Sequence, residues 1–283
     1  MPLIEDRFPE FYCRADEHSA LWQRRYLRTE KVQLATLLLA AGVGSVAGPP
    51  ALVVLLFGAA LMAQVYRLTS RADEKWWNGR AGAESAKTAA WRFVVGGEPF
   101  GIHNHQSEIE LATRMVEVAR EVAQLMPVPV NGDHVTDEMR TLRSRPLAER
   151  IDAYQSERIR SQRTWYACKS EFNSKRATIW SLVGVLSSGL ALGFGVGAAI
   201  YDWDLDAVGL FSAIGASVAA WMAVKQYQTL ARSYAVASAE LGAIDVKITG
   251  NPAWEEADWA SFVNEAEEAI SREHVSWRAS RAV

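Results

Sequence analysis

Cysteine is scarce in this chain, and neither sign of charge prevails. The 283 residues include only two cysteines, Cys13 and Cys168, so a scaffold held together by disulfides is excluded. The 30 basic and 33 acidic residues leave a formal charge of −3. A chain with this balance gives no reason to expect nucleic acid as a partner.

Motifs for catalysis and metal binding are also missing. His103 and His105 form the one close histidine pair, and no further ligand stands at a usual metal spacing. There is no G-x-S-x-G motif, and neither cysteine has the sequence context of a catalytic nucleophile. The glycines of 193–197 imitate a dinucleotide loop but lie inside an apolar run. We therefore expect no enzyme and no metal or cofactor site. A soluble helical protein with an enzymatic site is a further alternative, and cell fractionation is the experiment that decides it.

Long apolar runs are what the sequence does contain. The run 32–66 is free of charge and is broken by Gly48-Pro49-Pro50, and the run 177–224 has charges only at three central aspartates, Asp202, Asp204 and Asp206. Each run fits two apolar helices joined by a turn. In the first run about 17 or 18 residues lie on either side of the break, near the lower length limit for a hydrocarbon core about 30 Å thick, and the second run gives spans of about 177–201 and 207–224. We expect an all-α membrane protein with two transmembrane helical hairpins, hence four spans. The alternative is a soluble protein with two buried hairpins.

Charge asymmetry predicts the orientation of these hairpins. Neither turn contains Lys or Arg, whereas basic residues flank both runs. They are Arg24, Arg25, Arg28, Lys31, Arg67, Arg71, Lys75 and Arg80 around the first run, and Arg158, Arg160, Arg163, Lys169, Lys175, Arg176, Lys225 and Arg232 around the second. The positive-inside rule then places the N- and C-termini in the cytosol.

Outside the hairpins, apolar residues recur at steps of three and four, which predicts a cytosolic helical bundle. One stripe is Ile109, Ala112, Met115, Val116, Ala119, Val122, Ala123 and Met126, and a second is Trp259, Phe262, Val263, Ala266, Ala269 and Ile270. Glu110 and Arg114 are spaced for a supporting ion pair on the first helix. We see no convincing run of alternating strand residues.

The two halves of the chain resemble each other in layout. Each has a basic aromatic helix, then a hairpin, then a helix with an aromatic residue and an acid, which are Trp77 with Glu84 and Tyr234 with Glu240. A period of about 145 residues indicates a tandem repeat. We place the first unit at residues 1–130, with hairpin 32–66, and the second at 137–283, with hairpin 177–224.

The stretch after the first hairpin carries a family signature. Residues 77–88, WNGRAGAESAKT, are followed by Trp91-Arg92-Phe93 and Glu98-Pro99-Phe100. This resembles the pattern W-x-x-R-A-x-A-E-S-x-K-T-x-x-W-R and then E-P-F of the SLATT proteins, the SMODS and SLOG associating two-transmembrane effector domains. The second half, with Arg163-Thr164-Trp165-Tyr166 before its hairpin, is similar to another SLATT subtype.

The resemblance implies a membrane effector of a prokaryotic conflict or antiphage defence system. Such a protein is expected in the bacterial inner (cytoplasmic) membrane, where a cytosolic trigger opens or assembles a pore, or ion channel, that depolarises the membrane. A nucleotide second messenger and a sensor protein are the two candidate triggers. The alternative function is a non-conducting scaffold or receptor that recruits cytosolic partners through its helical bundle.

The signature residues are the candidates for coupling the bundle to the spans. They are Trp77, Arg80, Glu84, Lys87, Trp91 and Arg92. Arg80 and Glu84 are spaced for an ion pair on one helix face, and the tryptophans suit anchors against the bundle or the membrane interface.

Small residues mark candidate association faces in the second hairpin. Gly189, Gly193 and Gly197 recur every four residues, and Gly215 lies in a small-residue stripe on the following span. Such faces let helices approach closely within one chain or between chains, and we expect a homo-oligomer embedded in membrane lipid. Ser187, Ser188, Ser212 and Ser217 either line a narrow pore or bond to carbonyls of their own helix.

Overall fold

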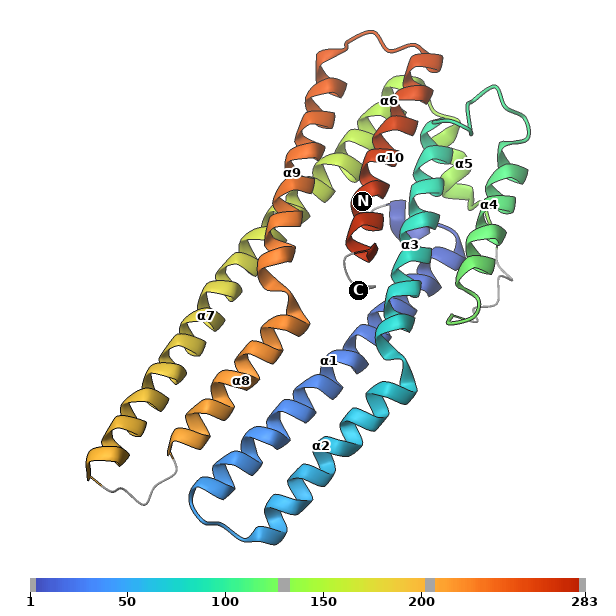
Figure 1. The fold of residues 1–283 in the computed structure, drawn as a ribbon. Coiled ribbons are helices and arrows are strands. Elements are labelled where there is room, and N and C mark those ends of the chain that lie inside the picture. Colours follow the sequence, from blue (N-terminus) through green and yellow to red (C-terminus); the bar gives the residue numbers. More distant parts are fainter. Residues whose placement is uncertain (1–3, 127–132, 202–206, 280–283) are drawn as a thin grey trace. The chain divides into compact units, whose positions relative to one another are not determined.

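Every regular element that the structure describes is a helix. The structure, a computed structural model, describes residues 4–126, 133–201 and 207–279, and it has no strand within these ranges (Figure 1). The elements are η1 (Ile4–Arg7), α1 (Glu10–Ser45), α2 (Pro50–Ser70), α3 (Ala72–Val95), α4 (Ser107–Val122), α5 (Asp137–Arg143), α6 (Leu147–Ala153), the π-helix η2 (Tyr154–Arg160), α7 (Ser161–Tyr201), α8 (Ala207–Lys225), α9 (Tyr227–Gly250) and α10 (Glu256–Ala279). The all-α prediction is confirmed for these residues.

The helices pack into two compact units. Unit 1 comprises the described parts of residues 1–23, 73–168 and 233–283, and unit 2 those of 24–72 and 169–232. The two long helices α1 and α7 contribute residues to both units. Since each unit takes residues from both halves of the chain, the repeat in the sequence is not a division into two separately packed halves.

An aromatic cluster occupies the core of unit 1. The rings of Trp91 and Tyr154 meet edge to face with centroids 5.9 Å apart, and Tyr154 meets Trp259 in the same way at 5.6 Å. Helix α10 buries Trp259, Val263, Ala266 and Ile270 on one face, so the second predicted stripe is confirmed for these four residues, whereas Phe262 and Ala269 are partly buried. These rings come from α3, η2 and α10, so the core joins segments that lie far apart in the sequence.

Helix α4 corrects the first predicted stripe. Its buried face is Leu111, Met115, Val118 and Val122, whereas Ile109 and Ala123 are exposed. The predicted set mixed this face with the neighbouring one, because Ala112, Val116 and Ala119 are only partly buried. The expected Glu110–Arg114 pair is also wrong: Arg114 pairs with Glu117 at 3.1 Å, and Glu110 accepts a hydrogen bond from Asn104.

Two helical hairpins make up most of unit 2, one formed by α1 and α2 and the other by α7 and α8 (Figure 1). An ion pair of 2.9 Å joins Arg67 to the buried Glu30 across the first hairpin. In the second, the rings of Phe194 and Phe211 stack with centroids 5.4 Å apart. Both hairpins therefore form as predicted, although the Asp202–Asp206 turn lies outside the described residues, as do residues 127–132 at the expected unit boundary.

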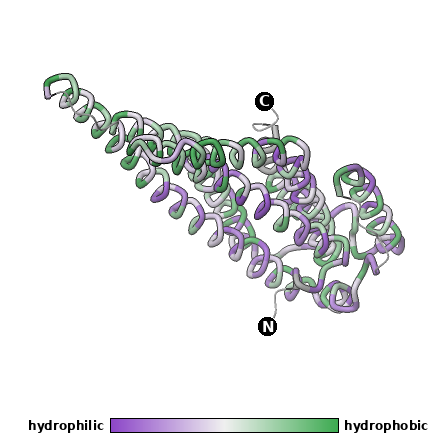
Figure 2. Tube along the Cα trace, turned by 90° about the horizontal axis from the view of Figure 1, so that it is seen from below, coloured by the Kyte–Doolittle hydropathy of each residue, from purple (hydrophilic) through white to green (hydrophobic). Residues whose placement is uncertain are grey.

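Among the residues that the structure describes, three helices are long and apolar enough to cross a membrane. The candidate segments lie in Pro50–Ser70, Leu147–Tyr201 and Ala207–Gly250, and only 11% of each apolar window is buried. Figure 2 colours the end of the second hairpin, at the left of the view, mainly hydrophobic. Side chains such as Leu55, Met62 and Leu192 are exposed to the outside, so a soluble protein with buried hairpins does not fit.

The fourth expected span, in α1, does not meet the same criterion. The charge-free part of α1 runs from Val32 to Ser45 and is therefore about 21 Å long at 1.5 Å per residue. That length falls short of the hydrocarbon core of a typical bilayer. Four spans remain a prediction, since the helix reaches the membrane thickness only if its basic and acidic residues near Lys31 enter the interface.

Gly96 gives a test of the unit 1 core. Its φ of +78° suits glycine, and a Cβ there would lie 2.8 Å from Arg150 Nη1 and 2.9 Å from Ile102 Cγ1. Because Arg150 is fully buried and hydrogen-bonded, it cannot move aside. We expect Gly96→Ala to lower the melting temperature by about 4 °C or more, measured by tryptophan fluorescence. Gly101→Ala is the matched control, since no atom lies within 4 Å of its Cβ position, and an equal loss there would contradict the explanation.

Candidate functional site

Helix α3 carries the signature residues, and its first turns hold the ion pair that their spacing predicts. Arg80 Nη2 lies 2.6 Å from Glu84 Oε1, which confirms the expected pair and raises the pKa of Arg80. Asp16 of α1 lies 4.0 Å from the same guanidinium. Trp77 stacks on Trp76 with centroids 3.8 Å apart. The start of α3 is therefore fixed to α1 within unit 1 by charge as well as by packing.

Lys87 and Trp91 converge on a single carboxylate from the N-terminal segment. Lys87 Nζ lies 2.7 Å from Glu5 Oε2, and the Trp91 indole N–H donates to Glu5 Oε1 at 2.9 Å. Lys87 and Trp91 are both buried. Two of the predicted coupling residues thus form a buried polar contact. Burial alone would suggest apolar side chains at these positions.

A fully buried ion pair lies next to this contact. Arg158 of η2 donates from Nε and Nη2 to Glu267 of α10 at 2.9 and 2.7 Å, and both side chains have no exposed surface. The Tyr154 hydroxyl donates to Glu267 Oε1, and Thr88 Oγ1 of α3 donates to Oε2, each at 3.0 Å. Burial, and secondarily the Glu267 carboxylate, hold the pKa of Tyr154 well above its usual value. We call Glu5, Lys87, Thr88, Tyr154, Arg158 and Glu267 the polar core cluster.

Two further arginines fasten the segment that follows α3. Arg143 donates to the carbonyls of Phe93, Phe100 and Gly101, and burial lowers its pKa to about 10. Arg150 is buried and donates to the Val95 carbonyl at 2.7 Å, and it also pairs with Glu256. The signature residue Phe100 is consequently held in the core.

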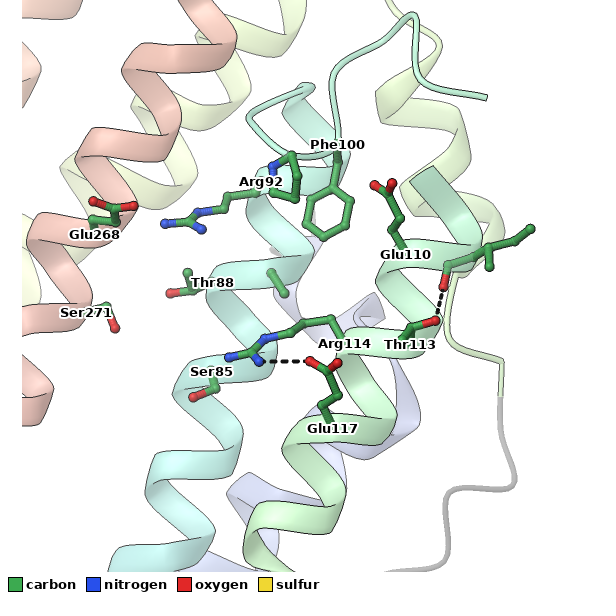
Figure 3. A pocket seen from close by; sticks show the side chains of 13 residues that line it. Ser85, Thr88, Arg92, Phe100, Glu110, Thr113, Arg114, Glu117, Glu268 and Ser271 are labelled. Carbon is green, nitrogen blue, oxygen red and sulfur yellow. Dashed lines mark hydrogen bonds and ion pairs between the residues drawn. The ribbon is translucent and has the colours of Figure 1, made fainter. Parts of the chain in front are cut away.

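The other face of α3 opens onto a cavity of about 940 Å³ inside unit 1. Helices α3, α4 and α10 and the segment after α3 supply its walls (Figure 3). Signature residues line it, among them Ser85, Thr88 and Arg92. Arg92 extends from α3 toward Glu268 of α10 in this view and donates to the Asn264 carbonyl at 3.2 Å. The signature therefore has two sides, one in the polar core cluster and one in the cavity.

The second half of the chain has a simpler aromatic arrangement. Trp165 and Tyr166 of α7 contact Tyr234 of α9, with centroids 5.6 and 5.5 Å apart. Arg163 lies 3.5 Å from Asp245. The residues that carried the resemblance of the second half thus join α7 to α9, as the signature residues of the first half join α1 to α3.

The small residues of the second hairpin fall into two groups. Gly189 and Gly193 are exposed and have no atom within 4 Å of a Cβ position, while Gly197 is buried. A Cβ on Gly215 would lie 3.2 Å from Ser187 Oγ, so Gly215 packs against α7 within the chain. No described residue of the chain lies within 4 Å of a Cβ position at Gly189 or Gly193, so this face is uncovered in the described part of the chain.

The four serines likewise differ in their surroundings. Ser187 is buried, and its hydroxyl donates to the Gly184 carbonyl at 2.9 Å, as one of the two readings of these residues expects. Ser188 and Ser212 are exposed, and Ser217 is partly exposed. A pore lined by Ser188, Ser212 and Ser217 stays a prediction.

Comparison with protein-family models identifies the chain. Residues 9–151 match SMODS and SLOG-associating 2TM effector domain 3, and residues 154–277 match domain 1 of the same series. The chain belongs to the SLATT family. It contains two tandem SLATT domains, and the contact of Thr88 with Glu267 joins the first domain to the second. Neither a comparison with curated proteins nor one with solved structures finds a match.

Sequence reasoning missed the arginines on which this SLATT core depends. Arg143, Arg150 and Arg158 lie in a stretch of frequent charges, and their partners are about 40 to 110 positions away in sequence. No local pattern distinguishes them from surface arginines. Within the part of the chain that the structure describes, no three His, Cys, Asp or Glu side chains are grouped to hold a metal ion.

The buried ion pair gives a test of the polar core cluster. Arg158→Met leaves the Glu267 carboxylate buried and unpaired, which costs about 3–5 kcal/mol of stability. Adding Glu267→Gln removes that charge and keeps groups that bond to Tyr154 and Thr88. We expect the double variant to recover more than half of the melting temperature that the single variant loses.

The control for this cycle is the exposed pair of Arg140 with Glu108. Arg140→Met should cost no more than about 1 kcal/mol, since solvent screens an exposed pair. Thermal unfolding of all variants in the same lipid or detergent makes the comparison. A double variant less stable than Arg158→Met alone would show that the charge pair is not the decisive contact.

Proposed function

We propose that this SLATT protein is an oligomeric effector of the bacterial inner membrane, with both termini in the cytosol, that forms or opens a pore on a cytosolic trigger. Its family membership supports an effector role, and its exposed apolar helices support a membrane location. The basic residues that flank both hairpins support the orientation. A depolarising pore is the mode of action that these features favour.

The continuity of α1 and α7 is the observation that carries the proposal. Each is one unbroken helix with residues in both units, 36 residues long in α1 and 41 in α7. Helix α7 starts directly after η2, which holds Tyr154 and Arg158 of the polar core cluster. A shift in this cluster can therefore reach the second hairpin without crossing a loop, because a continuous helix transmits displacement along its axis.

The uncovered glycine face supports assembly of several chains. Lipid gives helices no hydrophobic reason to associate, so close packing at small residues takes that role. Gly189 and Gly193 offer such a face, and nothing in the described chain occupies it. Contact between copies at this face would place the second hairpins next to one another around a common axis.

The orientation can be tested by cysteine labelling in intact cells. A cysteine introduced at Asp204, in a chain with both native cysteines retained, should react with an impermeant maleimide. Exposed Cys168 belongs to unit 1 and should react only after the membrane is permeabilised. Labelling of Cys168 in intact cells, shown by its loss in Cys168→Ser, would reverse the proposed topology.

Conduction can be tested with Gly193→Leu. A leucine on the uncovered face blocks close approach of a second helix, and overpacking of this kind costs about 1–3 kcal/mol per contact. We expect association to weaken about tenfold or more, together with membrane depolarisation and growth arrest in expressing cells.

Gly58→Leu is the matched control, since Gly58 is also exposed, has no atom within 4 Å of its Cβ position, and lies outside the stripe. It should leave association and depolarisation unchanged. If wild-type oligomers arrest growth but neither depolarise cells nor make liposomes leak, the pore is wrong. The scaffold function, in which the helical bundle recruits cytosolic partners, then takes its place.

A further inference from the structure

Three of the charged side chains that line the cavity beside α3 have a polar partner nearby. Arg114 pairs with Glu117 at 3.1 Å, Glu110 accepts from Asn104 at 2.9 Å, and Glu268 accepts from Asn264 at 3.1 Å. Each of these lining side chains therefore has a polar partner on its own helix or in the neighbouring loop. They form the rim of the cavity on α4 and α10 (Figure 3).

Arg92 differs from the other charged groups that line the cavity. Among the described residues it has no carboxylate within ion-pair distance, and its Nε is buried without an acceptor. Its described hydrogen bond is the one to the Asn264 carbonyl, whereas a guanidinium has five N–H donors. The side chain of Arg92 is half-buried, and guanidinium donors that lack an acceptor cost free energy unless a ligand satisfies them. Arg92 therefore offers an anion a planar site with two parallel donors.

The surroundings of Arg92 indicate what the anion is attached to. Ala89, Pro99, Phe100 and Ile109 provide an apolar wall, and Ser85, Thr88 and Ser271 provide hydroxyl groups nearby. The volume of about 940 Å³ lies at the upper end of ordinary small-molecule sites. We propose that the cavity binds an organic anion, a phosphate or carboxylate joined to a flat apolar body, with the anion on Arg92 and the body against Phe100.

The carboxylate of Glu268 opposes the binding of an anion at this site. Its carboxylate points toward Arg92 from α10 without pairing with it (Figure 3). A bound anion would meet both the attraction of Arg92 and the repulsion of Glu268. Removal of the Glu268 charge should therefore tighten binding of an anion, whereas it would weaken binding of a cation.

Calorimetry on the full chain in lipid nanodiscs tests the proposal without any measurement of conduction. The probes are 1-naphthyl phosphate and 2-naphthoate, with inorganic phosphate and 1-naphthol as the charge alone and the body alone, and empty nanodiscs as the blank. At least one aromatic anion should bind tenfold or more tightly than both partial probes, and the tighter one identifies the anionic group. Absence of binding by both aromatic anions, or equal binding of 1-naphthol, overturns the proposal.

Four variants locate the bound probe. Arg92→Gln should weaken binding about tenfold or more, since it removes charge-assisted hydrogen bonds. Thr113→Trp, at an exposed position on the cavity wall, should also weaken it by filling space. Glu268→Gln should tighten it. Arg120→Gln makes the same charge change as Arg92→Gln at an exposed site on α4 outside the cavity, and it should leave binding unchanged.

Melting temperatures show which variants are folded. If Arg92→Gln unfolds, Thr113→Trp and Glu268→Gln decide the matter. Wild-type affinity in Thr113→Trp, or weaker anion binding in Glu268→Gln, overturns the assignment. Because binding is measured directly, a failed pore and a failed ligand site give different results.

Discussion

The buried pair of Arg158 and Glu267 is the contact on which unit 1 depends. Removal of both charges from water costs several kcal/mol for each ion, so the pair persists only where hydrogen bonds satisfy it on every side. Tyr154 and Thr88 complete that set, each at 3.0 Å from a Glu267 oxygen. These bonds have strict geometry, and they therefore fix the register of α3, η2 and α10 against one another. A hydrophobic contact alone would allow those helices to slide.

This constraint joins the two SLATT domains of the chain. Glu267 belongs to the second domain and Thr88 to the first, so neither domain completes the core by itself. The two domains also share a feature where each hairpin returns: Arg71 follows α2 and Gln226 follows α8, and both have φ of +48°. A non-glycine residue in this conformation costs about 1–2 kcal/mol. Since the same strained link recurs in both domains, it belongs to the SLATT architecture of this chain and turns each hairpin into the helix that follows it.

The sequence predicts the features that depend on local pattern. Apolar runs locate the hairpins, the i,i+4 spacing gives the Arg80–Glu84 pair, and the apolar period gives the buried face of α10. It fails where the partner is distant: nothing near Arg150 or Arg158 signals Val95 or Glu267, which approach only after folding. The sequence also assigns the buried face of α4 to a slightly wrong side of the helix, because two neighbouring faces of α4 are both rich in alanine and valine. The first apolar helix is shorter than the run in the sequence indicates, because α1 ends at Ser45, before Gly48-Pro49-Pro50.

Thr88 connects the two sides of α3. Its hydroxyl donates to Glu267 in the polar core cluster, and the same residue lines the cavity that contains Arg92. A hydroxyl has one proton to donate. A cavity ligand with an acceptor near Thr88 would compete for that proton, and Glu267 would then lose one of the bonds that offset its burial. The loss of that bond would weaken the ion pair of Glu267 with Arg158, and Arg158 lies in η2, directly before α7. Two hydrogen bonds in succession, Thr88 to Glu267 and Arg158 to Glu267, thus connect the cavity wall with η2, the element that leads directly into α7.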